Sequence, residues 1–270
     1  DNMPISQASF LPKGILIDLD GTLADSRLNI SMEAKNILSA LQKHIPVSLC
    51  TGRLFAALYS SIMPLFPPTR VHIVAGGGQL VQSDGTILWE SKIPSSQIKE
   101  VAEHVDRLGS GFVFGQGQTL YCNSKVIGKF QTHPWNFRVG LPNTLSDWSS
   151  PLLSIIDLNE FVISYIQSIE DLHVQKMISS HGRSYFDITA LGVEKGFAAK
   201  KWSSHYKIDL SSISAVGDNL NDLGLLNEVG HKVVVRTAPQ EVLEIADEII
   251  APPEDGGIAQ YLQNTLDSIS

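Results

Sequence analysis

The stretch from Ile15 to Leu23 constrains the fold most, because it is an apolar run that ends in two aspartates, a glycine and a threonine. A run without polar alternation suits a central parallel strand that is covered on both faces, and ligands in such sheets bind beyond the carboxyl ends of the strands. We therefore expect Asp18 and Asp20 at that edge, and on one side of the strand because side chains alternate along it.

The chemistry of this pair depends on how close the two carboxylates lie. They repel one another unless a cation lies between them, and oxygen ligands at this density suit Mg²⁺. An aspartate can also attack phosphorus as a nucleophile and form an aspartyl-phosphate. Taken alone, the D-x-D pattern is short, and two strand-end aspartates that cap the following turn are the alternative interpretation.

The segments on either side of this run alternate between strand and helix patterns. After the first strand we expect a helix capped by Ser31, strands over 46–50 and 71–75, and a helix between them from about Leu54 to near Pro64. The alternation resumes near the C-terminus with elements over 195–206, 213–216, 232–235, 241–246, 248–250 and 258–266. This order predicts an α/β fold with a Rossmann-like doubly wound parallel sheet.

The middle of the chain breaks this alternation and predicts an inserted domain. Ser83-Asp84-Gly85 favours a tight hairpin turn, and several short strands and two amphipathic helices follow. We expect residues 1–85 and 188–270 to form the core and residues 86–187 a smaller inserted α+β domain. Residues 123–150 show no clear period, and because so long a loop is unusual we expect further elements inside it.

Charge and cysteine content exclude several classes of partner. The chain has 28 acidic and 20 basic residues, a formal charge of −8, so its surface repels nucleic acid and anionic membranes. Cys50 and Cys122 give no disulfide framework, and we expect free thiols in a reducing compartment. No run is apolar enough to span a membrane and no signal peptide pattern begins the chain, which predicts a cytoplasmic protein.

Four separate pieces of the sequence carry polar residues at predicted strand ends or helix starts. They are Asp18 with Asp20, Thr51 with Gly52, Lys195, and Asp218 with Asn221 and Asp222. Each piece alone has a structural explanation, such as a helix cap, a solvated lysine or a turn aspartate. In a doubly wound sheet all four come to one edge, so we predict that they form one site.

These motifs resemble the haloacid dehalogenase superfamily of phosphohydrolases, in particular its type II-B branch of Cof-type sugar phosphatases and sucrose-phosphate phosphatases. Asp18 to Leu23 match D-x-D-G-T-L, Thr51-Gly52-Arg53 the second motif, Lys195 in Glu194-Lys195-Gly196 the third, and Gly217 to Asp222 match G-D-x-x-N-D. The resemblance covers nearly the whole chain and implies that the insert is a C2-type cap.

The resemblance implies a role for each motif residue. Asp18 would be the nucleophile and Asp20 the general acid and base, with Mg²⁺ held by Asp18, Asp218 and the Asp20 backbone carbonyl. Phosphate and substrate would be bound by Thr51, Gly52, Arg53, Lys195 and Asn221, while Asp222 would orient the set. For Arg53, a structural ion pair to the cap or to the core is the alternative interpretation. We also expect the Asp18 charge to raise the pKa of Asp20, and a helix that starts after Gly52 to favour the phosphate.

Two features bear on substrate choice. The third strand ends in Gly76-Gly77-Gly78, where the family usually has an Asn-Gly pair. Polar and aromatic residues of the insert that are candidates for substrate contact, although each also suits an ordinary surface or core position, are Gln116, Gln118, Tyr121, His133, Trp135 and Arg138.

We therefore predict a Mg²⁺-dependent phosphomonoester hydrolase that acts through an aspartyl-phosphate on a small phosphorylated metabolite, in particular a sugar phosphate. A phosphomutase of the same fold is one alternative, because the same nucleophile can return phosphate to another hydroxyl. A non-catalytic phosphosugar-binding protein is the other, although a binder has no need of Asp18, Asp20, Lys195 and Asp218 together.

Overall fold

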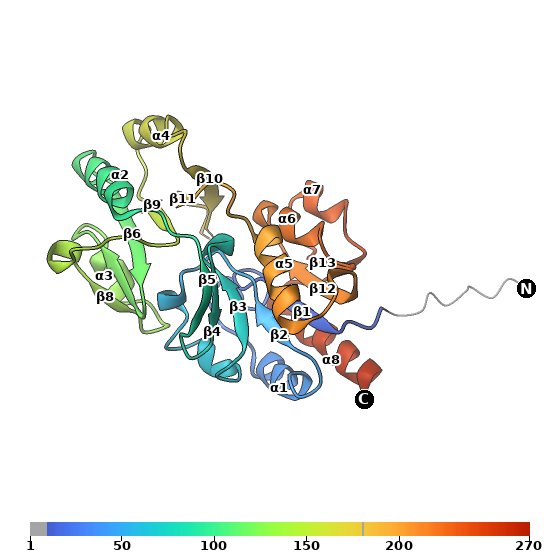
Figure 1. The fold of residues 1–270 in the computed structure, drawn as a ribbon. Helices are drawn as coiled ribbons and strands as arrows, with labels where there is room; N and C mark the ends of the chain where they lie inside the picture. The colour runs from blue at the N-terminus through green and yellow to red at the C-terminus, as the bar shows by residue number, and fades with distance from the viewer. Residues whose placement is uncertain (1–9, 180) are drawn as a thin grey trace, which may run out of the picture.

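The computed structural model describes residues 10–179 and 181–270. Strand β1 (Gly14–Ile17) belongs to a five-stranded parallel sheet with the order β14-β13-β12-β1-β2 (Figure 1). The other strands of this sheet are β2 (Val47–Leu49), β12 (Ile213–Gly217), β13 (His231–Val235) and β14 (Glu248–Ile250). Because β1 pairs with both β2 and β12, the N-terminal and C-terminal parts of the chain build one sheet, and the predicted parallel sheet is confirmed.

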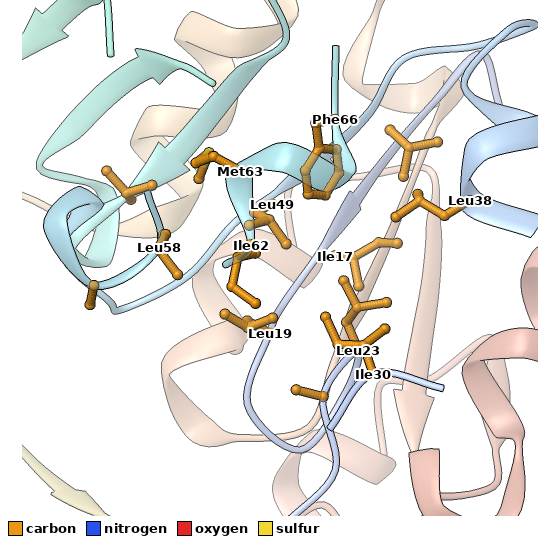
Figure 2. Packing of buried hydrophobic residues seen from close by; sticks show 14 of the residues in the cluster. Ile17, Leu19, Leu23, Ile30, Leu38, Leu49, Leu58, Ile62, Met63 and Phe66 are labelled. Atoms are coloured by element: carbon orange, nitrogen blue, oxygen red, sulfur yellow. The ribbon is translucent and has the colours of Figure 1, made fainter. Parts of the chain in front are cut away.

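Helices cover both faces of the parallel sheet. Helices α1 (Met32–Leu41) and α8 (Gly257–Ile269) share an apolar cluster with Ile15 and Ile17 of β1. Helices α5 (Lys195–Tyr206), α6 (Leu223–Leu226) and α7 (Gln240–Leu243) share the opposite cluster with Leu16. Side chains of β1 thus alternate between two cores, as a strand covered on both faces requires. Figure 2 shows buried side chains of the first cluster around Ile17.

Strand β3 (Val71–Val74) starts a three-stranded antiparallel sheet with β4 (Gln79–Gln82) and β5 (Ile87–Glu90). A single parallel bridge between Cys50 and Ile73 connects β3 to the edge of the large sheet. The predicted hairpin at Ser83-Asp84-Gly85 joins β4 to β5. The predicted insert begins within this hairpin, and the limits of the two domains remain a prediction.

The inserted segment contains a six-stranded sheet with the order β10-β11-β9-β6-β7-β8, which we call the cap sheet. Its strands are β6 (Gly111–Gln116), β7 (Thr119–Cys122), β8 (Arg138–Gly140), β9 (Leu153–Ile156), β10 (His173–Ile178) and β11 (Ser184–Thr189). Helix α3 (Ile127–Gln131) lies in the connection between β7 and β8. Helix α3 and β8 lie within 123–150, so further elements exist there as predicted.

Helices α2 (Ser95–Arg107) and α4 (Glu160–Gln167) pack on one face of the cap sheet. Phe112, Phe114 and Ile155 point into that cluster, whereas Val113 and Ile156, their neighbours along the strands, belong with the cluster of the core. The alternation therefore leaves the second face of the cap sheet directed at the edge of the parallel sheet.

The helix predicted from about Leu54 is wrong. Two short 3₁₀ turns, Phe55–Ala57 and Met63–Leu65, take its place. Leu54, Phe55, Ala56, Leu58 and Ile62 are all buried, rather than only those along one stripe, in the apolar cluster that joins residues of the core with Val113 and Leu120 of the cap sheet. Packing on several sides thus decides the conformation of this segment, and Pro64 sets the second turn.

Two smaller expectations concern the cysteines and membrane spans. Cys50 and Cys122 are free, as predicted, and both are buried. Within residues 10–179 and 181–270, no helix combines the length and the apolarity that crossing a membrane requires.

Candidate active site

The ends of two neighbouring strands bring Asp18 and Asp218 together. Asp18 directly follows β1 and Asp218 directly follows β12, and the two strands pair in parallel with Ile17 opposite Val216. Carboxylate oxygens of Asp18, Asp218 and Asp222 all lie within 4.8 Å of one another. Two residues 200 positions apart thus meet because parallel neighbours end at the same edge of the sheet.

Lys195 joins this group from the first position of α5. Its side chain is buried, and Nζ donates hydrogen bonds to Asp18 Oδ1 at 2.9 Å and Asp222 Oδ1 at 2.6 Å. Burial alone would lower the pKa of Lys195, but the charges of Asp18 and Asp222 outweigh it and raise the pKa well above its usual value. The lysine therefore stays charged inside the protein.

Asp222 connects this lysine to the loop after β12. Its Oδ2 accepts hydrogen bonds from the backbone N–H groups of Asp218 at 3.0 Å and Asn219 at 3.1 Å. A Cβ atom on Gly217 would lie 2.7 Å from the Asp222 carboxylate, so only glycine fits there. Asp222, which is fully buried, thus holds the backbone that carries Asp218 and also fixes Lys195.

The carboxylates of this cluster are crowded enough to change their titration. Burial, followed by the charge of Asp222, raises the pKa of Asp18 to about 6. Burial, followed by the charge of Asp18, raises the pKa of Asp218 to about 9, although Thr22 Oγ1 donates a 3.1 Å hydrogen bond to it. A divalent cation would remove this repulsion, and hard oxygen ligands suit Mg²⁺, so these side chains fit a metal ion.

Asp20 lies beside the cluster but has a different partner. Arg53 donates two hydrogen bonds to it, from Nε to Oδ2 and from the second guanidinium nitrogen to Oδ1, both 2.7 Å long. Burial opposes ionisation, yet the Arg53 charge and these hydrogen bonds hold the pKa of Asp20 below its usual value. The expectation that Asp18 raises this pKa is therefore wrong, because an arginine that sequence spacing did not assign to Asp20 forms a two-point ion pair with it.

Arg53 also contacts the inserted segment. Its guanidinium lies over the Trp135 ring, 4.4 Å from the centroid. The Trp135 indole N–H donates to the Leu28 carbonyl of the core at 3.0 Å. Arg53 therefore links Asp20 to the insert, in addition to lining the cavity described below.

The loop with Thr51 and Gly52 is shaped by the end of β3. Gly76 N–H donates to the Thr51 carbonyl at 3.0 Å, and Ala75 N–H to the Arg53 carbonyl at 2.7 Å. Arg53 N–H donates to Thr51 Oγ1 at 3.1 Å. Only a short 3₁₀ turn follows, so the expected α-helix N-terminus after Gly52 is wrong, and positive potential at this edge comes from side chains and single amides.

Asn221 lies near Gly52 and lines the same cavities. Its Nδ2 lies 4.0 Å from the position that a Cβ on Gly52 would occupy. Its Oδ1 is buried and has no hydrogen-bond partner among the described residues. A polar atom left in this state next to a loop amide indicates a place where a polar ligand binds.

A cavity of about 400 Å³ lies between this edge and the open face of the cap sheet. The predicted residues that line it are Asp18, Asp20, Thr51, Gly52, Arg53, Asp218 and Asn221. Lys195 lines an adjoining cavity of about 200 Å³, together with Gly76 and Thr189. The structure thus brings all residues predicted from the four motifs to the two cavities except Asp222, which instead accepts a hydrogen bond from Lys195.

Sequence reasoning missed the residues that the insert contributes to the larger cavity, among them Val113, Leu120, Phe137, Ser154, Tyr185 and Asp187. The strand alternation contains the missing signal, because Tyr185 and Asp187 alternate with the buried Phe186 and Ile188. None of the six candidates taken from the insert, all of which lie in the described part of the chain, lines either cavity. Trp135 instead packs on Arg53, and the Gln116 amide binds backbone carbonyls.

Comparison with known proteins agrees with this geometry. A model of the family described as haloacid dehalogenase-like hydrolase matches residues 15–262. The chain is 23% identical to Phosphatase YwpJ of Bacillus subtilis over 94% of this chain and 100% of the relative. It is also 23% identical to the 5-amino-6-(5-phospho-D-ribitylamino)uracil phosphatase YwtE of Bacillus subtilis, over 94% of this chain and 98% of the relative.

A solved structure extends the likeness to three dimensions. The subclass IIB sugar phosphatase BT4131 superimposes with a TM-score of 0.76 at 19% identity, and the match covers 96% of this chain and 100% of that chain. Sequence and fold therefore agree over nearly the entire length.

Proposed function

Because the chain belongs to the haloacid dehalogenase-like hydrolases, as a phosphatase of their type II-B branch, we propose that it is a Mg²⁺-dependent phosphomonoester hydrolase acting through an aspartyl-phosphate. The meeting of Asp18, Asp218 and Lys195 at one strand edge supports this proposal most. We also propose that residues 1–85 and 188–270 form the catalytic core and residues 86–187 the cap. The buried free thiols favour a cytoplasmic location.

In the first step, an Asp18 oxygen forms a bond to phosphorus while the ester P–O bond breaks. Lys195 keeps Asp18 ionised against the effect of burial, and with Thr51 and the Gly52 amide it faces the charge of the phosphoryl oxygens. The leaving oxygen takes a proton from Asp20. Because Arg53 holds Asp20 largely ionised, esters whose leaving oxygen is stable as an anion are expected to react fastest.

In the second step, water attacks phosphorus and the bond between phosphorus and Asp18 breaks. Asp20, ionised beside Arg53, is suited to take the proton from this water, and free Asp18 is restored. Asp18, Asp218 and the Asp20 backbone carbonyl would hold Mg²⁺, which when bound neutralises charge on the phosphoryl oxygens. The cap sheet covers the cavity and limits its contact with bulk water.

The proposed substrate is a small phosphorylated metabolite. One relative is named as a phosphatase of a phosphorylated ribitylaminouracil, and the solved neighbour as a sugar phosphatase. Sugar phosphates are therefore the first class to test. A cavity of about 400 Å³ limits the leaving group to the size of a metabolite.

The test measures inorganic phosphate released from 4-nitrophenyl phosphate and a panel of sugar phosphates, with Mg²⁺ and after chelation. We expect Asp18→Asn to lower the release at least about a thousandfold, because an amide cannot form the acyl phosphate. Asp267→Asn, an exposed change on α8, is the matched control and should have no effect. Undiminished release by Asp18→Asn, or release that survives chelation, would contradict the proposal.

The same samples separate the alternatives. A phosphomutase converts one sugar phosphate into an isomer with little inorganic phosphate. A non-catalytic binder gives neither isomer nor phosphate, but binds sugar phosphates tightly.

A further inference from the structure

The open face of the cap sheet changes from polar to apolar along one row of side chains. Asp187 of β11 pairs with Ser154 of β9, Ser154 with Val113 of β6, and Val113 with Cys122 of β7. Gln175 of β10 lies on the other side of Asp187. Cross-strand partners point to the same face, so the row runs from an amide, through a carboxylate and a hydroxyl, to a branched apolar side chain and a thiol.

The core loop that carries Gly52 and Leu54 crosses beneath this row. Asp187 Oδ2 lies 3.8 Å from the position that a Cβ on Gly52 would occupy. Two residues further on, the Leu54 side chain lies 3.3 Å from the Cβ position of Gly115 on β6. The loop therefore begins below the polar end of the row and continues below its apolar end. A leaving group attached to a phosphate at Gly52 meets Asp187 first.

Beyond that point the cavity is walled by hydrocarbon. The side chains that line this part are Leu28, Leu54, Val113, Leu120, Phe130 and Phe137. The first two come from the core and the other four from the insert. A sugar placed here would exchange water for these side chains at several hydroxyls, and each hydroxyl left without a hydrogen-bond partner weakens binding.

Asp187 is an unusual neighbour for a phosphate site. One of its oxygens accepts a short hydrogen bond from Ser154 Oγ, and the other faces Gly52. A carboxylate next to a phosphate dianion weakens binding unless a hydrogen-bond donor lies between them. Burial raises the pKa of Asp187 to about 6, and the Ser154 hydrogen bond and the charge of Arg53, which both lower it, offset this effect only in part.

We infer that the substrate is a phosphomonoester whose leaving alcohol carries one hydrogen-bond donor next to the phosphate, bound by Asp187, and an apolar body of about the size of an aromatic ring. This inference rests on the proposed phosphatase function and narrows its substrate class. Asp187 and Phe137 are accordingly specificity-determining residues of the larger cavity.

Three phosphomonoesters test the two parts of the inference separately. They are 2-hydroxy-2-phenylethyl phosphate, which has both donor and ring, 2-phenylethyl phosphate, which lacks the donor, and glucose 6-phosphate, which lacks the apolar body. The hydroxyl ester should have a kcat/KM at least about tenfold above either of the others.

Two variants, each with a matched partner, assign the preference to residues. Asp187→Ala should lower kcat/KM about tenfold or more for the hydroxyl ester and change it little for 2-phenylethyl phosphate, whereas Asp187→Asn, which keeps an acceptor, should restore much of the difference. Phe137→Ser should weaken both phenyl esters and spare glucose 6-phosphate. Phe161→Ser, which alters an exposed phenyl ring on the outer helix α4, should change none of them.

The outcomes distinguish this inference from the function on which it rests. Phosphate release with glucose 6-phosphate preferred, or equal losses for both phenyl esters in Asp187→Ala with folding unchanged by circular dichroism, overturns the inference alone. No release from these three esters or from 4-nitrophenyl phosphate in the presence of Mg²⁺ overturns the proposed function, and the inference with it.

Discussion

The two walls of the larger cavity are built on opposite principles. On the core side, Asp18 and Asp218 line the cavity and are held by two buried residues that do not line it: Lys195 donates to Asp18 and Asp222, and Asp222 accepts from the Asp218 backbone N–H, so each residue is fixed by the others. On the cap side, most of the side chains that line the cavity are apolar. Among the described residues of this side, Asp187 supplies the carboxylate. Interlocked charges resist substitution, whereas an apolar wall can change its shape one residue at a time. The comparison indicates that the core fixes the reaction and the cap the leaving group.

The strongest test of the comparison replaces the central cation of the core wall. Lys195→Met should lower kcat/KM at least about a hundredfold, because it removes a donor to the developing charge. It should also lower the free energy of unfolding by about 3–5 kcal/mol, because Asp18 and Asp222 lose their buried partner. Denaturant unfolding and steady-state kinetics measure the two effects.

Lys200→Met on the same helix is its control. Lys200 is exposed and pairs with Glu228 at 3.2 Å, so its loss should change the free energy of unfolding by less than about 0.5 kcal/mol. If Lys195→Met and Lys200→Met lowered the free energy of unfolding equally, the hydrogen-bonded charges of the core side would not be harder to replace than exposed ones, which would contradict the comparison.

A second prediction concerns Arg53, which connects the two walls through Asp20 and Trp135. Arg53→Lys keeps the charge but not the two-point hydrogen bond, so the pKa of Asp20 should rise towards its ordinary value. The first step needs protonated Asp20, so a higher pKa keeps this form present to a higher pH. The alkaline limb of the kcat/KM profile for an alkyl phosphate should therefore move upward, with about a tenfold gain above its midpoint. Arg138→Lys, which loses one exposed bond to Gln118, should leave the limb in place.

A third prediction uses the stability of the cap wall. Burial raises the pKa of Asp187 to about 6 from an ordinary value of 3.8, so the folded protein binds this proton more tightly than the unfolded chain does. The destabilisation is absent below about pH 4, grows between the two pKa values and is complete above about pH 6. Asp187→Asn should therefore raise the free energy of unfolding by about 1–3 kcal/mol near pH 8 and by little near pH 4.

The exposed Asp209 should show the opposite dependence of stability on pH. Hydrogen bonds from Ser211 lower the pKa of Asp209, so its contribution to stability is present above its ordinary pKa and lost as the pH falls. Asp209→Asn should accordingly be less stable than the parent at neutral pH. An Asp187→Asn variant that followed the same trend would mean that the cap carboxylate is already compensated.

The smallest expected effect lies in the adjoining cavity of about 200 Å³. Gly76 has φ +65°, a conformation that asparagine tolerates, and no atom lies within 4 Å of the position that a Cβ on it would occupy. Thr189 Oγ1, buried in the same cavity, has no hydrogen-bond partner among the described residues. The side chain introduced by Gly76→Asn would offer Thr189 Oγ1 a hydrogen-bond partner. Gly76→Asn should therefore raise the free energy of unfolding by about 0.5–1 kcal/mol relative to Gly117→Asn, a glycine with φ +54° in equally open space that has no such neighbour to satisfy in the described part of the chain. Equal melting temperatures would contradict this.

Much of the core followed from local patterns. The apolar run before Asp18 predicted a strand covered on both faces, and alternation of elements predicted the parallel sheet. Because parallel strands end at one edge, these two facts were enough to bring Asp18, Asp218 and Lys195 together. Ser31 also caps α1 as expected, since capping depends on neighbours along the chain.

The errors share a physical cause, which is packing between segments distant in sequence. The expected helix after Leu54 became two short turns because its apolar residues are buried from several directions. Asp20 was expected to have a raised pKa, but the folded loop places Arg53 against it. Neither result is encoded in the periodicity of the segment concerned.

The sequence by itself determined which residues end the strands of the parallel sheet, because strand period and motif spacing are local properties. Only the tertiary structure decided what faces them: the ion pair of Asp20, the apolar wall and Asp187 opposite Gly52. These depend on how the cap sheet lies over the core, and that arrangement arises from contacts between residues that no local pattern pairs.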